Sequence, residues 1–219
     1  HWINHEFISI SNISKLKKPF VWTFHDMWPI CGGSHYEGDN QTARWRIGYH
    51  SKNRPKGDRG LDLDRWIWGR KRRFWGDMKF SVICPSVWLA ECVKESLIFK
   101  NKKVFVVPNP LNTDLFKPYD KKMARSILGL PINKKLVLFG AMDGISDPRK
   151  GWDLLEGALK ILATDSDIEG VIFGQHKPFK EINLKVSLNW LGEINDDHQL
   201  ALAYSAADVM VVPSRQENL

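Results

Sequence analysis

The sequence predicts an α/β fold with parallel sheets of the doubly wound kind. Short apolar segments of strand length alternate along the chain with segments whose apolar residues recur at helical spacing. This alternation is typical of parallel sheets covered by helices. The chain has 219 residues, of which 43% are hydrophobic and 26% charged, so it is globular and long enough for one large domain or two small ones.

In the first half of the chain, strands are predicted where β-branched and aromatic residues cluster. These segments are residues 19–24, 80–84 and 104–107. A helix is predicted over residues 61–78, and Ser86 can cap a second helix that ends near residue 96. The polar segment 36–60 predicts a long loop.

The second half repeats this alternation after an irregular, proline-containing connector at residues 112–118. Strands are predicted at residues 135–139, 168–173, 186–190 and 209–212. A short helix is expected over residues 121–128, and Asn195 is expected to cap another. We expect the domain boundary at this connector, because irregular, proline-containing segments are typical linkers. The N-terminal domain would then comprise residues 1–115 and the C-terminal domain residues 116–219.

The segment most informative about function is residues 139–155, which comprises a strand end, a loop with two glycines and the start of a helix. Asp147 can cap this helix and Pro148 suits its first position, so Arg149 and Lys150 would lie near a helix N-terminus. Open α/β sheets bind ligands at the carboxyl ends of strands, and helix N-termini favour anions. The segment therefore predicts phosphate or diphosphate binding, with an ordinary solvated basic loop as the alternative.

Two other polar side chains follow predicted strands. His25, with Asp26 after it, comes directly after a strand, where a histidine can act as a general base, hydrogen-bond a substrate or bind a metal. The alternative is a histidine whose ring is satisfied by a backbone carbonyl. Glu217 follows the last predicted strand, where a carboxylate can accept hydrogen bonds from sugar hydroxyls. The alternative there is a solvent-facing acid in a loop.

The net charge of +7 permits nucleic acid, an anionic membrane or phosphorylated small molecules as partners. The segment of residues 65–75 combines tryptophans with arginines and could contact a membrane surface or nucleic acid. The simpler interpretation is a helix with an aromatic core face and a solvated basic face. Asp62 and Asp64 form a DxD pattern that can bind a metal, but the first turn of this helix is the simpler place for them.

Several kinds of site are not supported. Neither GxGxxG nor GxxxxGK[ST] occurs, so the dinucleotide and P-loop fingerprints are absent. Cys31, Cys84 and Cys92 form no disulfide framework, and no familiar zinc spacing is present. Because the cysteines form no such framework, a reducing compartment is the simpler assumption, and we expect a cytoplasmic location. No apolar run approaches a membrane span and no signal peptide is recognised.

Five segments taken together resemble the retaining glycosyltransferases of the GT-B fold, in the large family called glycosyl transferases group 1, or family 4. They are VWTFHDMWPICGGSHY from Val21, VICPSVWLAECVKES from Val82, VVPNPLNTDLFKP from Val106, DPRKGWDLLEGAL from Asp147 and AYSAADVMVVPSRQENL from Ala203. The first segment is similar to the branch found in bacterial polysaccharide and lipopolysaccharide clusters. The resemblance implies two Rossmann-like domains that face a cleft, both incomplete here, so we expect an internal fragment of a longer enzyme.

On the donor side, the resemblance implies that the C-terminal domain binds a nucleotide-diphosphate sugar. Lys150 and Arg149 match residues that hold the diphosphate, near the strand-end Gly140, and Glu217 matches the first glutamate of a paired motif that contacts the donor sugar. The second glutamate of that motif would lie beyond the end of the chain. The family usually carries an arginine after the strand-end glycine, but this chain has Ala141 there, and Arg149 could supply the missing charge.

On the acceptor side, the resemblance implies that the N-terminal domain binds a carbohydrate or lipid-linked acceptor. His25 matches a histidine that reaches the donor sugar, and Asp26, Gly32 and Gly33 would lie on the acceptor side. The implied reaction retains the anomeric configuration, needs no metal or other cofactor and serves cell-surface polysaccharide synthesis. We expect no nucleic acid partner, while a peripheral contact with the inner face of the cytoplasmic membrane stays open.

Two alternatives remain. One is a noncatalytic basic module that binds nucleic acid or an anionic membrane, supported by the net charge of +7 and by residues 65–75. The other is a GT-B sugar-nucleotide epimerase. Neither alternative accounts for the position of His25, Lys150 and Glu217 at the ends of predicted strands.

Overall fold

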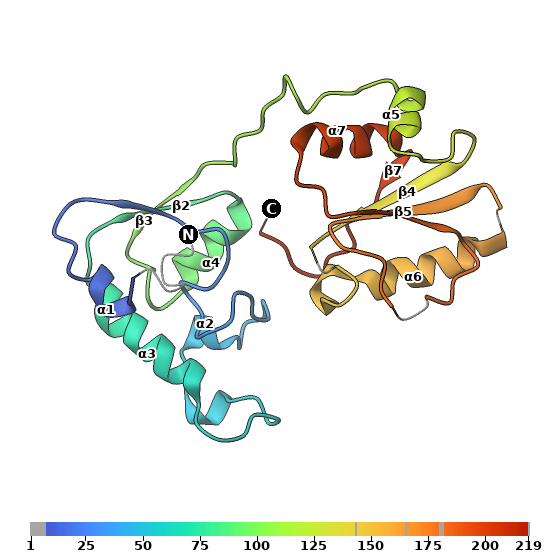
Figure 1. Cartoon of the computed structure of the whole chain (residues 1–219). Helices are drawn as coiled ribbons and strands as arrows, with labels where there is room; N and C mark the ends of the chain where they lie inside the picture. Colours follow the sequence, from blue (N-terminus) through green and yellow to red (C-terminus); the bar gives the residue numbers. More distant parts are fainter. Residues whose placement is uncertain (1–7, 143, 165, 180–181, 219) are drawn as a thin grey trace. The chain divides into compact units, whose positions relative to one another are not determined.

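The computed structural model describes residues 8–142, 144–164, 166–179 and 182–218 (Figure 1). These residues form two compact units, one of residues up to Asn109 together with Asn218, and one of Pro110–Glu217. Each unit contains one parallel sheet with helices, which confirms the predicted α/β fold. The assignment of residues 1–115 and 116–219 to acceptor and donor domains stays a prediction. Within the described residues, no helix has the length and apolar character needed to cross a lipid bilayer.

The sheet of the first unit has three strands in the order β1–β2–β3, all parallel. They are β1 (Val21–Thr23), β2 (Ser81–Cys84) and β3 (Lys103–Val106), and the α-helices of this unit are α1 (Ile10–Ile13), α2 (Arg44–Ile47), α3 (Leu63–Trp75) and α4 (Val87–Glu95). Ser86 caps α4 as predicted, because its hydroxyl accepts a hydrogen bond of 3.2 Å from the backbone N–H of Leu89. The predicted strands and both predicted helices of this half are thus confirmed, with shorter ends except for β3, which has the predicted length but begins one residue earlier.

The segment 36–60 is not one continuous loop, and that prediction was wrong. It contains α2 and a 3-10 helix, η1 (Ser51–Asn53). The indole of Trp45 in α2 is fully buried, and its Nε1 donates a hydrogen bond of 3.1 Å to the carbonyl of Gly38. Helices of three or four residues are too short to produce a periodic apolar pattern, which is why the sequence did not reveal them.

Aromatic side chains build the core of the first unit. The ring of Trp22 lies edge-on to Trp75 at 5.0 Å and to Phe24 at 5.1 Å between centroids. Trp75 also donates a hydrogen bond of 2.9 Å from Nε1 to the carbonyl of Ile10, which ties α3 to α1. Trp75 lies four residues after Lys71 and seven after Trp68, and all three are buried, so this helical stripe is the inner face of α3.

The sheet of the second unit has four parallel strands in the order β6–β5–β4–β7. They are β4 (Lys135–Gly140), β5 (Ile168–Phe173), β6 (Leu188–Gly192) and β7 (Val209–Met210), with the helices α5 (Lys121–Ile127), α6 (Trp152–Ile161) and α7 (Asp197–Ala206) and the 3-10 helices η2 (Pro148–Lys150) and η3 (Leu162–Thr164). Residues from α5 and α7 share one core cluster with the sheet and residues from α6 share another, so helices cover both faces (Figure 1). This arrangement is the doubly wound one that the sequence predicted.

Helix α7 begins one residue later than expected. Its cap is Asp196, whose side chain accepts hydrogen bonds of 3.2 Å from the backbone N–H groups of His198 and Gln199. The prediction that Asn195 caps this helix was therefore wrong. Asparagine and aspartate are equally good caps, so local propensity could not choose between the two neighbouring positions.

A buried guanidinium joins three segments of the second unit. Arg125 of α5 is 4% exposed and pairs with Asp208 at 2.7 Å. It also donates hydrogen bonds of 2.8 Å to the carbonyls of Ala206, Ile132 and Lys134. Asp208 in turn accepts 2.7 Å hydrogen bonds from the backbone N–H of Leu136 and from Lys121. One ion pair therefore links α5 to the beginnings of β4 and β7.

The substitution Asp208→Asn tests this link through its pH dependence. Partial burial raises the pKa of Asp208, but hydrogen bonds from Lys121, Leu136 and Arg125 outweigh burial and bring the pKa to about 2, below the ordinary 3.8. A carboxylate with a lowered pKa stabilises the fold above its unfolded-state pKa, and this stabilisation is lost as the pH falls through the folded-state value. We expect Asp208→Asn to cost about 2 kcal/mol at neutral pH, because Arg125 stays buried without its charged partner.

Denaturant unfolding from neutral pH down to the folded-state pKa of about 2 measures this effect. The wild-type chain should lose more stability than Asp208→Asn below the unfolded-state pKa of 3.8. Asp114→Asn, at an exposed position in the same unit, is the control and should change stability by less than about 0.5 kcal/mol. Equal loss of stability in acid for wild type and Asp208→Asn would show that a group other than Asp208 dominates the pH dependence of unfolding.

Candidate functional site

In the second unit, η2 and the segment after β7 hold a group of charged side chains. Lys150 Nζ lies 2.6 Å from Glu217 Oε1, and Arg149 Nη1 lies 3.2 Å from Glu217 Oε2. Each of the three side chains is between 21% and 28% exposed. The structure therefore brings together the three donor-side charges that the sequence singled out, although they are separated by more than sixty residues.

Backbone contacts hold the two segments together. Gly151 adopts a φ of 71°, and a Cβ at this position would lie 2.2 Å from the carbonyl oxygen of Pro213. The backbone N–H of Arg215 donates to the carbonyl of Arg149 at 2.8 Å. Its side chain pairs with Asp153 at 2.6 Å, a contact that sequence reasoning missed. Only a glycine allows the turn to approach the 213–217 segment this closely.

The helix start that the sequence predicted here is only partly correct. Asp147 caps as expected, accepting a hydrogen bond of 2.9 Å from the backbone N–H of Arg149, and Pro148 follows it. However, Arg149 and Lys150 belong to a 3-10 turn, and α6 begins only after Gly151, at Trp152. The left-handed conformation of Gly151 interrupts the helix and turns both cations toward Glu217.

The charges of this group shift the pKa of Glu217. Partial burial raises it, but hydrogen bonds from Lys150 and Ser214 and the charges of Lys150 and Arg149 outweigh burial and lower the pKa below its ordinary value. Glu217 is therefore ionised at neutral pH. A carboxylate held between two cations can accept hydrogen bonds from hydroxyl groups, while the cations can bind an anion.

Gly140 ends β4 opposite Phe173 of β5. A Cβ at Gly140 would lie 1.9 Å from Cζ of the Phe173 ring, so this ring covers the position. The next loops are also in close contact, because a Cβ at Gly174, which has a φ of 85°, would lie 2.7 Å from the carbonyl oxygen of Ala141. Packing against the Phe173 ring therefore disfavours a side chain at position 140, and the role of Gly140 in donor binding stays a prediction.

In the first unit, Asp26 organises the loop after β1. It is 7% exposed, and its two carboxylate oxygens accept from the backbone N–H of Trp28 at 2.9 Å and contact His35 Nδ1 at 2.7 Å. The neighbouring His25 is half-buried. The predicted roles of His25 toward the donor sugar and of Asp26 on the acceptor side stay predictions.

The Gly32–Gly33 turn is held by side chains from distant segments. The backbone N–H of Gly32 donates to the Tyr49 hydroxyl at 2.8 Å, and that of Gly33 donates to Asp64 Oδ1 at 2.6 Å. A Cβ at Gly32 would lie 2.6 Å from Cβ of Asp64, so the turn and the start of α3 are in close contact. Asp62 caps α3 through the N–H of Arg65, which confirms the helix-start interpretation for this residue. The acceptor-side role of both glycines stays a prediction.

Lys71 is the residue of this region that sequence reasoning missed. It is fully buried, and its ammonium donates to the carbonyls of Trp28, Cys31 and Gly32, the last at 2.7 Å. Burial lowers the pKa of Lys71 to about 7, and the nearby acids Asp26 and Asp64 oppose this shift only in part. The signal in the sequence was its spacing from the two core tryptophans of α3, which places Lys71 on the inner face rather than the solvated one.

A polar pocket adjoins this turn. Its volume is about 440 Å³, and it is lined by Ser34, Glu37, Gly38, Asn40, Thr42, Ala43, Arg44, Asn53, Pro55, Asp58 and Asp64. Arg44 pairs with Asp62 at 2.5 Å, so most of its charge is neutralised within the protein. Hydroxyl, amide and carboxylate groups that converge on a pocket of this size suit a small polar ligand.

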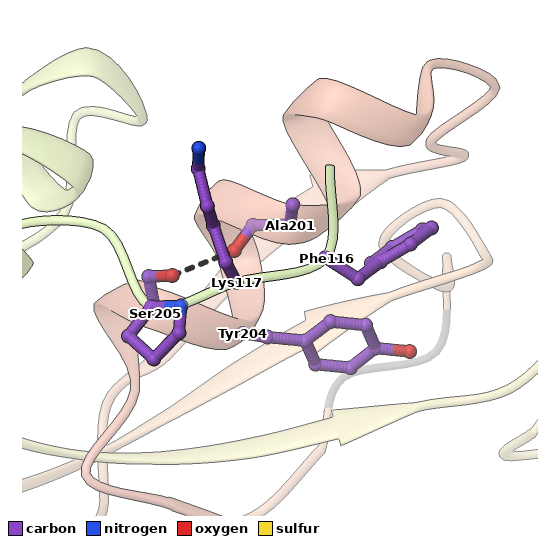
Figure 2. A pocket seen from close by; sticks show the side chains of 6 residues that line it. Phe116, Lys117, Ala201, Tyr204 and Ser205 are labelled. Atoms are coloured by element: carbon purple, nitrogen blue, oxygen red, sulfur yellow. Dashed lines mark hydrogen bonds between the residues drawn. The ribbon is translucent and has the colours of Figure 1, made fainter. Parts of the chain in front are cut away.

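A second hollow lies where the connector meets α7 (Figure 2). Its volume is about 300 Å³, and it is lined by Phe116, Lys117, Pro118, Ala201, Tyr204 and Ser205. The rings of Phe116 and Tyr204 lie 6.5 Å apart between centroids, and the backbone N–H of Tyr119 donates to Ser205 Oγ at 3.1 Å. The side chain of Lys117 extends away from the two rings (Figure 2). These contacts attach the connector to α7 and offer no cluster of cations for a diphosphate.

Among the described residues, no group of three or more His, Cys, Asp or Glu side chains is arranged to hold a metal ion. The three cysteines are free thiols, and all are buried. The prediction that the reaction needs no metal stays a prediction.

Comparison with solved structures defines the class of fold. The sucrose-phosphate synthase of Thermosynechococcus elongatus is 21% identical, with a TM-score of 0.59 over 91% of this chain and 45% of that one. WaaG, a glycosyltransferase involved in lipopolysaccharide biosynthesis, is 17% identical, with a TM-score of 0.56 over 70% of this chain and 44% of that one. Anabaena HepE, solved with UDP and glucose, is 17% identical, with a TM-score of 0.50 over 89% of this chain and 46% of that one. These similarities show the GT-B fold.

The family follows from the sequence of the first half. The family model described as Glycosyltransferase Family 4 matches residues 3–115, more than half of the chain, so the chain belongs to this family. The resemblance found from the five segments is thereby confirmed. None of the curated proteins compared with the chain matches it. The chain spans less than half the length of the three solved structures to which it is similar.

The substitution Lys71→Met tests how the loop after β1 is held. It removes three hydrogen bonds and leaves three carbonyls without their donor, so we expect a loss of about 2–4 kcal/mol in the free energy of unfolding. Lys79→Met makes the same change at an exposed lysine and should alter stability by less than about 0.5 kcal/mol. Denaturant unfolding of both variants decides the matter. Equal stability of the two variants would mean that the desolvation cost of the Lys71 ammonium cancels the stabilisation from its hydrogen bonds.

The substitution Gly140→Ala tests the contact with Phe173. The added methyl meets the ring, so we expect a loss of about 1–3 kcal/mol from overpacking. Gly157→Ala is the matched control, because a Cβ at Gly157 in α6 meets nothing within 4 Å and should stabilise the helix by up to about 1 kcal/mol. In a double-mutant cycle, Phe173→Ala should relieve the strain of Gly140→Ala. Additive losses in the double variant would contradict this account.

Proposed function

We propose that the chain is part of a retaining glycosyltransferase that transfers a sugar from a nucleotide-diphosphate sugar to a carbohydrate or lipid-linked acceptor. The observation that carries the proposal is the convergence of Lys150 and Arg149 on Glu217 beside the carboxyl ends of parallel strands. Membership of Glycosyltransferase Family 4 supports this reaction over epimerisation. It also favours an enzyme over a noncatalytic basic module.

The charges suit the leaving group of such a reaction. The bond between the anomeric carbon and a diphosphate oxygen breaks, and negative charge develops on the diphosphate near Lys150 and Arg149. Each well-placed donor of this kind lowers the barrier by roughly 3 kcal/mol. Glu217 would accept hydrogen bonds from hydroxyls of the donor sugar. The acceptor oxygen would bond to the same face of the anomeric carbon and pass its proton to the departing diphosphate, which retains the configuration without a carboxylate nucleophile.

The acceptor would occupy the polar pocket beside Gly33, since its hydroxyl, amide and carboxylate groups suit a sugar. A role in cell-surface polysaccharide synthesis is supported by the fold similarity to WaaG, which is involved in lipopolysaccharide biosynthesis. A nucleotide-sugar donor is supported by the fold similarity to HepE, whose structure contains UDP and glucose. We place the reaction in the cytoplasm, where buried free thiols such as Cys31 stay reduced.

The substitution Lys150→Ala tests the donor site. The melting temperature of the protein is measured with UDP, GDP, ADP, CMP and their sugar conjugates, since a ligand that binds only the folded state raises stability. One nucleoside diphosphate should stabilise the wild type, and Lys150→Ala should lose this shift. In the full-length protein, Lys150→Ala should also lower turnover by about a hundredfold to a thousandfold. Products formed with and without acceptor separate transfer from epimerisation.

Two further variants sharpen this experiment. Lys160→Ala removes an exposed lysine of α6 and should keep the full shift. Glu217→Gln removes the carboxylate that neutralises both cations, so it should strengthen binding of the nucleoside diphosphate and weaken the preference for its sugar conjugate. An unchanged ligand shift and unchanged turnover in Lys150→Ala would refute the proposed donor site.

A further inference from the structure

The net positive charge of the chain comes from its first half. Residues 1–109 contain 19 Lys and Arg against 10 Asp and Glu, a net charge of +9, whereas residues 110–219 contain 13 against 15, a net charge of −2. The cations proposed to bind the donor diphosphate are in the second half. The basic surplus of the first half therefore needs a different explanation, and such asymmetry is typical of proteins that bind an anionic surface.

The outer face of α3 concentrates this charge beside exposed apolar side chains. Trp66 is 58% exposed, and Leu63 and Leu61 are 61% and 85% exposed. The interpretation of this segment as an aromatic core face with a solvated basic face is therefore correct for Trp68 and Trp75 but wrong for Trp66. The aromatic ring is on the same outward side as the arginines, and the Arg70 guanidinium lies 4.9 Å from its centroid.

These side chains form a groove along the helix. Its volume is about 500 Å³, and its lining residues are Asp62, Arg65, Trp66, Gly69, Arg70 and Arg73. Gly69 and Arg70 lie three and four residues after Trp66, and Arg73 lies four and three residues after them, so all four form one stripe of α3. Asp62 pairs with Arg44 at 2.5 Å, and its charge therefore opposes the three guanidinium groups only weakly.

The floor of the groove is Gly69. Glycine in a helix interior is less favourable than alanine, so its presence in the second turn of α3 requires a reason. A Cβ at this position would meet nothing within 4 Å, so packing inside the protein does not require a glycine. The missing side chain leaves open space beside Arg65, Trp66 and Arg73, which line the same groove.

We propose that this outer face of α3 binds the phosphate headgroups of an anionic lipid bilayer. Arg65, Arg70 and Arg73 supply the charge, and guanidinium groups match phosphate oxygens in two-point hydrogen bonds. Trp66 and the exposed leucines enter the interfacial layer, where tryptophan is enriched and apolar area adds affinity. Binding to nucleic acid would use the arginines but would give no role to the exposed aliphatic side chains of Leu61 and Leu63. The inference is independent of the donor chemistry proposed above.

Vesicle sedimentation tests the proposal with the purified chain. The chain should bind vesicles that contain phosphatidylglycerol and should not bind vesicles of phosphatidylcholine alone, and added salt should weaken the binding. Each basic residue near such a surface strengthens binding roughly fivefold, so the double variant Arg70→Gln with Arg73→Gln should bind about 30-fold more weakly. Trp66→Ala should also weaken binding while leaving every charge in place.

Two controls separate this surface from charge in general. Lys94→Gln with Lys100→Gln removes the same charge at exposed positions elsewhere in the first unit, and binding should fall by less than about fivefold. Gly69→Ala should raise the melting temperature and still weaken vesicle binding, because it improves the helix and fills the groove. Equal binding to both kinds of vesicle, equal losses in the lysine and arginine pairs, or binding to single-stranded RNA without binding to vesicles would overturn the proposal. The nucleotide-induced melting shift, which reports the donor site, should be unchanged in all of these variants.

Discussion

The close approach of Gly151 to the carbonyl of Pro213 is the constraint on which the candidate donor site depends. A side chain at position 151 would collide with that oxygen, and the left-handed conformation of Gly151 separates η2 from α6. Because the turn approaches so closely, Arg149 and Lys150 reach a carboxylate that follows a different strand. The charge cluster is therefore a product of backbone geometry first and of electrostatic attraction second, since partly exposed ion pairs contribute little stability of their own.

Each unit fixes its irregular segments with a buried cation that donates to at least three backbone carbonyls. Lys71 does so for the loop after β1, and Arg125 does so for the segments around the start of β4. Loops at the edges of parallel sheets leave carbonyls without strand partners, and a buried carbonyl without a donor is costly. One long cationic side chain satisfies three of them at once. The two cations differ in how well their charge survives burial. Arg125 has Asp208 as a counterion, and a guanidinium stays protonated when buried. The ammonium of Lys71 has a pKa that burial lowers to about 7, so it titrates near neutral pH.

Much of the fold could be predicted from the sequence, because buried parallel strands are continuous apolar runs with clear ends. The strand at residues 168–173 has the predicted bounds, and α3 follows from its spacing of apolar residues. Contacts between distant segments could not be predicted in this way. No local pattern reveals that Arg215 would pair with Asp153, or that Tyr49 would hold Gly32. The meeting of Lys150 and Glu217 was predictable only because both follow parallel strands, whose carboxyl ends share one edge of the sheet.

Arg149 and Lys150 are adjacent, but their surroundings suit them to different tasks. The guanidinium of Arg149 pairs with Asp147 at 3.1 Å and donates to the carbonyl of Gln216 at 3.0 Å in addition to its contact with Glu217. The Arg149 side chain is therefore already positioned, and it would lose little conformational entropy on binding an anion. Lys150 makes its 2.6 Å contact with Glu217 through one flexible ammonium, which can turn toward a phosphate oxygen as charge develops there. In the proposed reaction, Arg149 fixes the 213–217 segment and supplies a positioned charge, and Lys150 is the cation that follows the charge developing on the diphosphate.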